Sequence, residues 1–296
     1  MYVREAARRL LLQLDQPIIT EYELFVRMNP VLVDGSFQGE PVIRRFQEWD
    51  AYRNRSLIRN LSRDRVLVQD DDFRSGVWRI VQSVTAGSAE EAVCLADPFC
   101  YVSHLSAMYR FNLTDRSPVE LHITTPDRPT WNAMRDAKMD TELSNISPRL
   151  EVPLLNRVGF KKLVRKREVS LHETKHPATP TAIRGEKARI APIAHVFVEM
   201  LEDPSLCGGI RHILDIWENE ARDWLNEIIS EVDRHTSKIV RVRAGYILDE
   251  RLGIKDPRID GWVRDAQRGG SRKLDPDVPY APTYSEKWML SINVED

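Results

Sequence analysis

The order of elements predicted for the first 82 residues constrains the fold most: helix, helix, helix, β-hairpin. Arg4–Leu14 places its apolar residues on one face of a helix, at three- and four-residue spacing. A capping box, with Thr20 at the N-cap and Glu23 three residues later, predicts a second, short helix that ends at Arg27. The spacing of apolar residues predicts a third helix over about Asp50–Asp64.

Two short apolar segments follow the third helix and predict a β-hairpin. They are Arg65–Gln69 and Val77–Val81, joined by Asp70–Gly76. Asn29–Glu40 carries a proline and two glycines, so we expect a loop there. Three helices closed by a hairpin form the layout of a winged helix-turn-helix. The sequence therefore predicts such a DNA-binding domain over residues 1–84.

The pattern changes after the small, polar segment Thr85–Glu90, which we expect to be a linker. Residues 91–296 predict a larger domain of mixed helices and strands with helices toward its C-terminal end, so the fold class is α+β. The predicted helices of this domain are Glu91–Ala96, Ser103–Phe111, Ile193–Leu201, Ile210–Ile229 and Ser237–Leu252. The predicted strands are Val119–Thr125, Leu163–Thr174 and Trp288–Val294, whereas residues 127–150 are expected to be loop-rich.

The third predicted helix concentrates positive charge on one side. Leu57, Ile58 and Leu61 cluster within about 100° of the helical wheel and define its buried side. Between Arg53 and Arg65 there are five arginines and one acid, a net charge of +4 in a chain whose net charge is 43 − 45 = −2. The expected DNA-contacting residues are Tyr52, Arg53, Arg55, Ser56, Arg59, Asn60 and Arg63 on this helix and Arg74 at the hairpin tip. A solvated helix face is the competing interpretation.

The hairpin tip carries both signs of charge. Asp70, Asp71 and Asp72 would repel phosphate, so we expect these acids to point away from DNA. Phe73, Arg74 and Ser75 are the tip residues that could touch it.

Several classes of protein and site are excluded or disfavoured. No stretch approaches 18 apolar residues and the N-terminus lacks the apolar core of a signal peptide, so no membrane span or export is expected. The three cysteines lack metal-binding spacing and fit a reducing cytoplasm. No phosphate-binding loop, dinucleotide fingerprint, nucleophile elbow or HExxH motif occurs. No catalytic residue, cofactor or metal is therefore predicted, and the protein is not expected to be an enzyme.

The best enzymatic alternative is a Mg²⁺-dependent nuclease of the PD…ExK type. Asp127 follows one predicted strand and Glu173-Thr174-Lys175 ends another. His172, Glu173 and His176 could suggest a metal site, but alternation along a strand would point His172 and Glu173 to opposite faces. His104 is expected to be a packed or capping histidine rather than a catalytic one.

An ordered set of segments resembles the AbiEi family of antitoxins. DPFCYVSHLSAMYRFNLTDRSPVELHITTP (Asp97–Pro126) is similar to the start of that family's second domain, with its aspartate-proline, its "Y.SH.SAL" helix and its strand ending in "TP". Gly185–Trp217, Lys238–Gly253 and Ser271–Val294 match further. The long segment Asn29–Glu48 and the apparent insertion at residues 127–150 depart from the expected pattern.

The resemblance implies a cytoplasmic bacterial antitoxin of a type IV, abortive-infection toxin–antitoxin pair used in phage defence. Its winged helix would bind inverted repeats in the promoter of its own operon and repress transcription. Its second domain would counteract a nucleotidyltransferase-like toxin, without a stable complex being required. A stand-alone transcription factor with a ligand-sensing second domain remains an alternative.

A second basic cluster allows three interpretations. It is a solvated strand edge, an extension of the DNA contact, or a surface for the toxin or its nucleic-acid substrate. Its residues are Lys161, Lys162, Arg165, Lys166 and Arg167.

Overall fold

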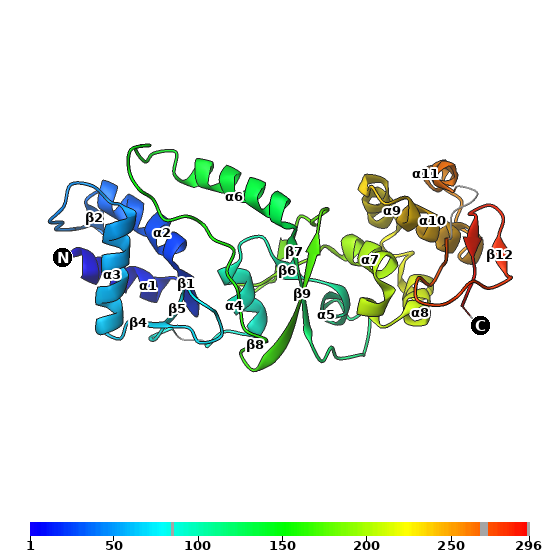
Figure 1. The fold of residues 1–296 in the computed structure, drawn as a ribbon, viewed down its shortest axis with the longest axis horizontal. Coiled ribbons are helices and arrows are strands. Elements are labelled where there is room, and N and C mark those ends of the chain that lie inside the picture. Colours follow the sequence, from blue (N-terminus) through cyan, green and yellow to red (C-terminus); the bar gives the residue numbers. More distant parts are fainter. Residues whose placement is uncertain (84–85, 267–271, 295–296) are drawn as a thin grey trace.

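The computed structural model describes residues 1–83, 86–266 and 272–294, and three parts follow one another along its long axis (Figure 1). A helical N-terminal unit comes first, a mixed sheet with flanking helices lies in the middle, and a group of helices forms the C-terminal end. This mixture of helices and strands confirms the predicted α+β class. The predicted boundary at residue 84 and the start of the segment Ser271–Val294 lie outside the described residues.

The N-terminal unit contains the three predicted helices and the predicted hairpin. Its elements are α1 (Val3–Gln13), β1 (Ile18–Thr20), α2 (Glu21–Val33), β2 (Ser36–Phe37), β3 (Glu40–Pro41), α3 (Ala51–Arg63), β4 (Leu67–Gln69) and β5 (Val77–Ile80). β4 and β5 pair antiparallel, and β1 pairs antiparallel with the other edge of β5, giving the strand order β1-β5-β4. The sequence did not predict β1, because three buried residues are too few to show alternation.

α2 is longer than predicted. Its N-cap is confirmed, because the Thr20 hydroxyl accepts a hydrogen bond from the backbone N–H of Glu23 at 3.2 Å. The helix continues past Arg27 to Val33 with Pro30 inside it, so the predicted loop over Asn29–Glu40 is wrong in its first part. Apolar side chains on both sides of the proline are buried, and their burial offsets the roughly 3 kcal/mol that an interior proline costs.

The middle part is built on a six-stranded sheet of order β10-β11-β6-β7-β9-β8. Its strands are β6 (Tyr101–Val102), β7 (Leu121–Pro126), β8 (Leu163–Val164), β9 (Arg167–Thr174), β10 (Thr181–Ala182) and β11 (Arg189–Ile190). The helices of this part are α4 (Ala89–Ala96), α5 (His104–Arg110) and α6 (Arg128–Glu142). β7 and β9 run parallel at its centre, with Leu121 opposite Val169.

The single strand predicted over Leu163–Thr174 is a hairpin. β8 and β9 pair antiparallel across Arg165 and Lys166, whose φ angles are 51° and 65°. Both residues adopt the left-handed conformation that tight hairpin turns require and that glycine or asparagine usually supplies. The turn therefore carried no recognisable sequence signal.

The predicted loop-rich segment at residues 127–150 is wrong, because α6 occupies most of it. The Asp127 carboxylate caps this helix, accepting a hydrogen bond from the N–H of Thr130 at 3.1 Å. Trp131 is its only buried residue, so the helix shows little of the apolar periodicity that predicts helices.

The C-terminal part is helical and ends in a small hairpin. Its elements are α7 (Ile193–Glu202), a 3-10 turn (Pro204–Cys207), α8 (Ile210–Glu220), α9 (Leu225–Arg234), α10 (Lys238–Gly245), a π-helical turn (Tyr246–Arg251), α11 (Pro257–Trp262), a 3-10 turn (Val263–Asp265), β12 (Tyr284–Ser285) and β13 (Leu290–Ser291). The helix predicted over Ile210–Ile229 is two helices with a turn at residues 221–224. The sequence did not reveal the break, because the apolar residues of α8 and α9 continue one helical stripe and are buried in the same core.

The hydrophobic core links the two predicted domains. The largest cluster of buried apolar side chains spans the sheet and the C-terminal helices and includes Ile18, Phe73 and Val77 of the N-terminal unit. The segment after α6 returns to that unit, where the carbonyl of Glu151 accepts a hydrogen bond from the N–H of Ala51 at 2.7 Å. Within the described residues, no helix combines the length and the apolar character that crossing a membrane requires.

Candidate nucleic-acid interface

α3 is fixed at its start and along its buried side. The Asp50 carboxylate caps it by accepting a hydrogen bond from the N–H of Arg53 at 2.8 Å. The predicted buried residues Leu57, Ile58 and Leu61 do lie in the core. Asn54 is also buried, and its side-chain amide donates to the carbonyl of Glu21 at 2.9 Å, tying α3 to α2. These contacts set which face of α3 meets solvent.

The solvent-facing side of α3 presents two arginines without ion pairs. Tyr52, Arg59 and Arg63 are exposed, and Ser56 is half-buried beside them. The Arg59 guanidinium lies 6.0 Å from the centre of the Tyr52 ring, within cation–π distance. Among the described residues, neither Arg59 nor Arg63 pairs with a carboxylate. Both guanidinium groups therefore remain available to an incoming anion.

Two other arginines of the predicted DNA-contacting set are already engaged. Arg53 pairs with Asp50, and its guanidinium lies 5.4 Å from the centre of the Phe46 ring. The Nε of Arg55 lies 2.9 Å from a carboxylate oxygen of Glu21. Because an anion would have to displace these partners, Arg53 and Arg55 are weaker candidates than Arg59 and Arg63. Asn60, also predicted, is half-buried.

An open groove of about 610 Å³ runs between α3 and β5. Its lining residues are Glu21, Arg55, Ile58, Arg59, Ser62, Arg63 and Trp78. Three arginines and one glutamate give this groove a formal charge of 3 − 1 = +2. Trp78 and Ser62 were not predicted: Trp78 belongs to the hairpin strand, and the pairing of β5 brings it next to α3.

At the tip of the β4–β5 hairpin, some charged side chains are exposed and others are ion-paired. Arg74 is exposed, and its backbone N–H donates to the carbonyl of Gly159 at 2.9 Å. Asp70 and Asp72 both pair with Arg165, whereas Asp71 is exposed. Asp70 and Asp72 are thus ion-paired within the protein and Asp71 is exposed to solvent, whereas their direction relative to DNA stays a prediction.

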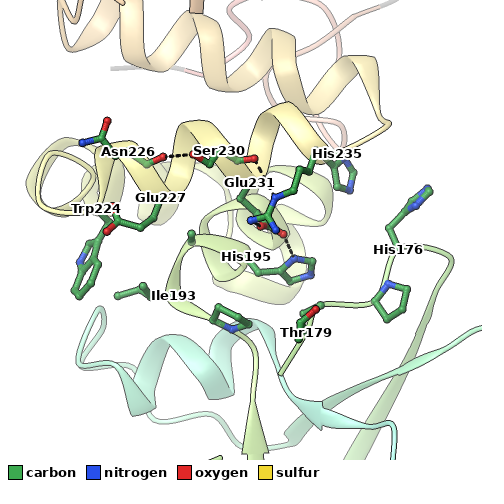
Figure 2. A pocket seen from close by; sticks show the side chains of 15 residues that line it. His176, Thr179, Ile193, His195, Trp224, Asn226, Glu227, Ser230, Glu231 and His235 are labelled. Carbon is green, nitrogen blue, oxygen red and sulfur yellow. Dashed lines mark hydrogen bonds and ion pairs between the residues drawn. The ribbon is translucent and has the colours of Figure 1, made fainter. Parts of the chain in front are cut away.

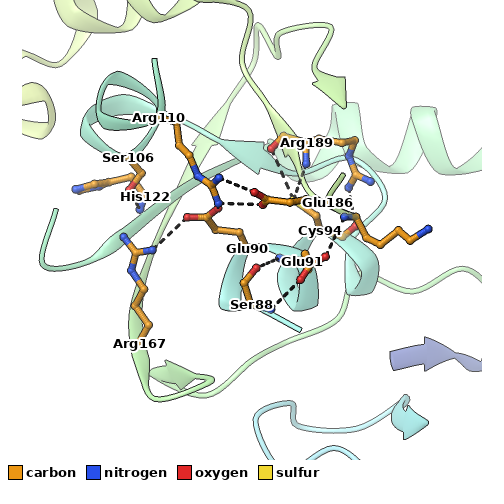
Figure 3. Close-up of polar contacts among 11 residues, drawn as sticks. Ser88, Glu90, Glu91, Cys94, Ser106, Arg110, His122, Arg167, Glu186 and Arg189 are labelled. Atoms are coloured by element: carbon orange, nitrogen blue, oxygen red, sulfur yellow. Dashed lines mark hydrogen bonds and ion pairs between the residues drawn. The ribbon is translucent and has the colours of Figure 1, made fainter. Parts of the chain in front are cut away.

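The second basic cluster is divided between three exposed lysines and two ion-paired arginines, and its interpretation as a binding surface stays a prediction. Arg165 is largely buried against the hairpin acids, and Lys162 lies 2.7 Å from Glu168. Arg167 pairs with Glu90, which also pairs with Arg110, so that one carboxylate lies between two guanidinium groups (Figure 3). Lys161, Lys162 and Lys166 are all exposed.

The residues of the nuclease alternative are occupied by structural contacts. Asp127 caps α6, and Glu173 lies 2.8 Å from Arg157. His172 stacks on His122, whereas His176 hydrogen-bonds the Thr236 hydroxyl at 2.8 Å. The described part of the chain contains no group of three or more histidine, cysteine, aspartate or glutamate side chains arranged to hold a metal ion.

Three histidines gather where α5 meets β7 and β9. The His104 ring centre lies 4.7 Å from that of His172, and His122 and His172 share a 3.1 Å hydrogen bond. Burial, and next the neighbouring His172, lower the pKa of His122 to about 4. Burial likewise lowers the pKa of His104 and of His172. All three imidazoles are therefore neutral at pH 7.

We predict that this cluster destabilises the protein in mild acid. Histidines of the unfolded chain take up protons near pH 6.5, whereas His122 resists protonation down to about pH 4. The free energy of unfolding should therefore be retained above pH 6.5 and fall between pH 6.5 and 4. Urea denaturation at a series of pH values measures this slope. The substitution His122→Gln should flatten it, whereas His176→Gln, at an exposed site, should not; equal slopes for both variants and the parent chain would contradict the assignment.

No protein-family model and no curated protein matches this chain. The arguments for its function therefore come from its own residues and from the motif resemblance described above.

Proposed function

We propose that residues 1–83 form a winged-helix domain that binds double-stranded DNA through α3 and the β4–β5 hairpin. The element order α1-β1-α2-α3-β4-β5 and the strand order β1-β5-β4 support this assignment. In helix-turn-helix proteins the recognition helix enters the major groove. Here that helix is α3, and β4–β5 is the wing.

The observation that carries the proposal is the state of Arg59 and Arg63. Both are exposed on the wall of a groove, at two positions one helical turn apart, and neither has a carboxylate partner among the described residues. Guanidinium groups of this kind bind phosphates and guanine edges bidentately. The chain as a whole has a net charge of −2, so this positive surface is local.

The motif resemblance extends the proposal from DNA binding to a biological role. We propose a cytoplasmic autorepressor that binds inverted repeats in its own operon promoter and acts as the antitoxin to a nucleotidyltransferase-like toxin. Motif residues hold the middle part together: Asp97 accepts hydrogen bonds from the Thr125 hydroxyl at 2.9 Å and from the Trp131 indole at 3.0 Å. Such buried polar contacts give a structural reason for the aspartate-proline and "TP" motifs.

The double substitution Arg59→Ala, Arg63→Ala tests the DNA interface. Each lost contact should cost about 1–3 kcal/mol, so together they should weaken binding to a promoter duplex roughly 30-fold or more. If both side chains contact phosphates, the slope of log affinity against log salt should also fall by about two units. Fluorescence anisotropy with a labelled duplex from the chain's own upstream region measures both effects.

A matched control removes the same charge elsewhere on the N-terminal unit. Arg9 and Arg27 are ion-paired with Glu40 and Glu23 and lie outside the groove. The double variant Arg9→Ala, Arg27→Ala should retain most of the affinity. If both double variants bind equally well, α3 is not the DNA-contacting helix.

A further inference from the structure

A second cavity, of about 260 Å³, lies between the ends of β7 and β9 and the helices α5, α7 and α10. Four carboxylates line it: Glu173, Glu199, Glu202 and Asp203. Three imidazoles, those of His104, His172 and His195, also line it, together with the hydroxyl-bearing residues Tyr101, Thr124, Thr174 and Ser237. No lysine or arginine occurs among its described lining residues, so the cavity is rich in hydrogen-bond acceptors and in negative charge.

Glu199 is the most unusual group in this cavity. It is 3% exposed, and one carboxylate oxygen accepts a hydrogen bond from the backbone N–H of His104 at 2.8 Å. The other oxygen, Oε1, has no hydrogen-bond partner. A buried carboxylate oxygen without a donor is costly, so this site favours a ligand that brings one.

The nearest imidazole does not supply that donor. The Nε2 of His195 lies 3.9 Å from Glu199 Oε1, beyond hydrogen-bond distance. On its other side, the Nδ1 of His195 lies 2.8 Å from Glu231, which holds the ring toward a neighbouring cavity (Figure 2). His195 thus separates the two cavities without completing the hydrogen bonding of Glu199.

The other carboxylates differ in how far they are compensated. Glu202 lies 3.1 Å from His235, and Glu173 pairs with Arg157. Asp203, exposed at the edge of the cavity, makes no ion pair within the described residues. Glu199 therefore leaves a buried open acceptor and Asp203 an unpaired exposed carboxylate, one helical turn apart at the C-terminal end of α7.

We propose that this cavity binds a small organic cation, whose ammonium or guanidinium N–H groups donate hydrogen bonds to Glu199 and Asp203. The cavity is small for a ligand pocket, which suits a short aliphatic cation better than a nucleotide. A metal ion is a poorer fit, because no three histidine, cysteine, aspartate or glutamate side chains of the described residues are arranged to coordinate one. Burial raises the pKa of Glu199 to about 7, so a bound cation would favour the ionised carboxylate.

Isothermal titration of the full-length chain with agmatine and with putrescine tests the proposal. Agmatine carries one guanidinium and one ammonium group and putrescine two ammonium groups, so binding of agmatine alone would show that the site requires a guanidinium. ZnCl₂ is titrated separately. We expect saturable binding of at least one organic cation below about 5 mM, weakened at least tenfold by Glu199→Gln. Glu199 is buried, so its substitution could also affect folding. Asp203→Asn is a second variant at an exposed position, where the substitution should leave the core unchanged.

Glu227→Gln is the matched control, because Glu227 is an exposed glutamate that lines the neighbouring cavity instead. Cation binding that is weakened in Glu199→Gln and Asp203→Asn but kept in Glu227→Gln supports the proposal. Binding of zinc alone, no saturable binding, or equal binding by all three variants and the parent chain overturns it. None of these results depends on DNA binding.

Discussion

Replacing Arg165 with alanine should lower the free energy of unfolding by about 3–5 kcal/mol, the usual cost of removing one partner from a buried ion pair. The Arg165 side chain is 13% exposed and that of Asp70 is 0% exposed, with 2.7 Å between Nη2 and the carboxylate. Arg165 also pairs with Asp72, whose carboxylate accepts the backbone N–H of Arg165 at 2.9 Å. Alanine would leave the buried Asp70 charge without its main counter-ion.

Urea denaturation at pH 7 measures this loss, and the next residue supplies the control. Lys166 shares the turn and its left-handed backbone but is exposed, so Lys166→Ala should change stability by less than about 0.5 kcal/mol. Adding Asp70→Asn to Arg165→Ala should restore part of the loss, because it removes a buried charge whose remaining counter-ion is the half-exposed Arg79, 3.4 Å away. If Arg165→Ala and Lys166→Ala were equally stable, the ion pair would contribute nothing.

The same ion pair shows why the charges could not be interpreted from the sequence. Asp70 and Arg165 are 95 residues apart, and each stands in a run of like charge. The acids were therefore interpreted by their effect on DNA, and Arg165 as part of a basic surface. Folding brings the two runs together at Arg165, which pairs with Asp70 and Asp72. Pairing over such a distance leaves no local pattern.

Secondary structure was predictable where apolar residues recur at helical spacing. α3 was predicted almost to its ends because Leu57, Ile58 and Leu61 mark its buried side. α6 was missed because Trp131 is its only buried residue and its few other apolar residues form no buried stripe, although Asp127 followed by Pro129 is a helix-start signal. The residues at the start of α6 therefore indicated a helix, whereas the spacing of its apolar residues did not.

The candidate DNA interface was predictable to the level of a helix face. Periodicity placed Arg59 and Arg63 opposite the buried side, and the structure exposes both. It could not show that Glu21, on another helix, neutralises Arg55, or that Trp78 faces the same groove. Periodicity predicts which side of a helix faces solvent, whereas the residues that contact that side from other elements are known only from the tertiary structure.

Gly245→Ala should destabilise the C-terminal part by about 3 kcal/mol, at the upper end of the usual cost of overpacking a core. A Cβ atom on Gly245, in α10, would lie 2.2 Å from ring carbons of Trp288. Trp288 is 0% exposed, and its indole N–H donates to Asp249 at 3.3 Å, so the ring has little room to move. Either α10 or the turn between β12 and β13, which carries Trp288, must shift.

Gly261→Ala is the matched control, since Gly261 is also helical, in α11, and a Cβ there would meet nothing within 4 Å. That variant should be more stable by about 0.5–1 kcal/mol, because alanine loses less backbone entropy than glycine in a helix. Thermal and urea denaturation of the two variants should therefore give shifts of opposite sign. Combining Gly245→Ala with Trp288→Leu should recover part of the loss if the ring causes the clash. Equal destabilisation by both glycine substitutions would instead place the effect in the helices themselves.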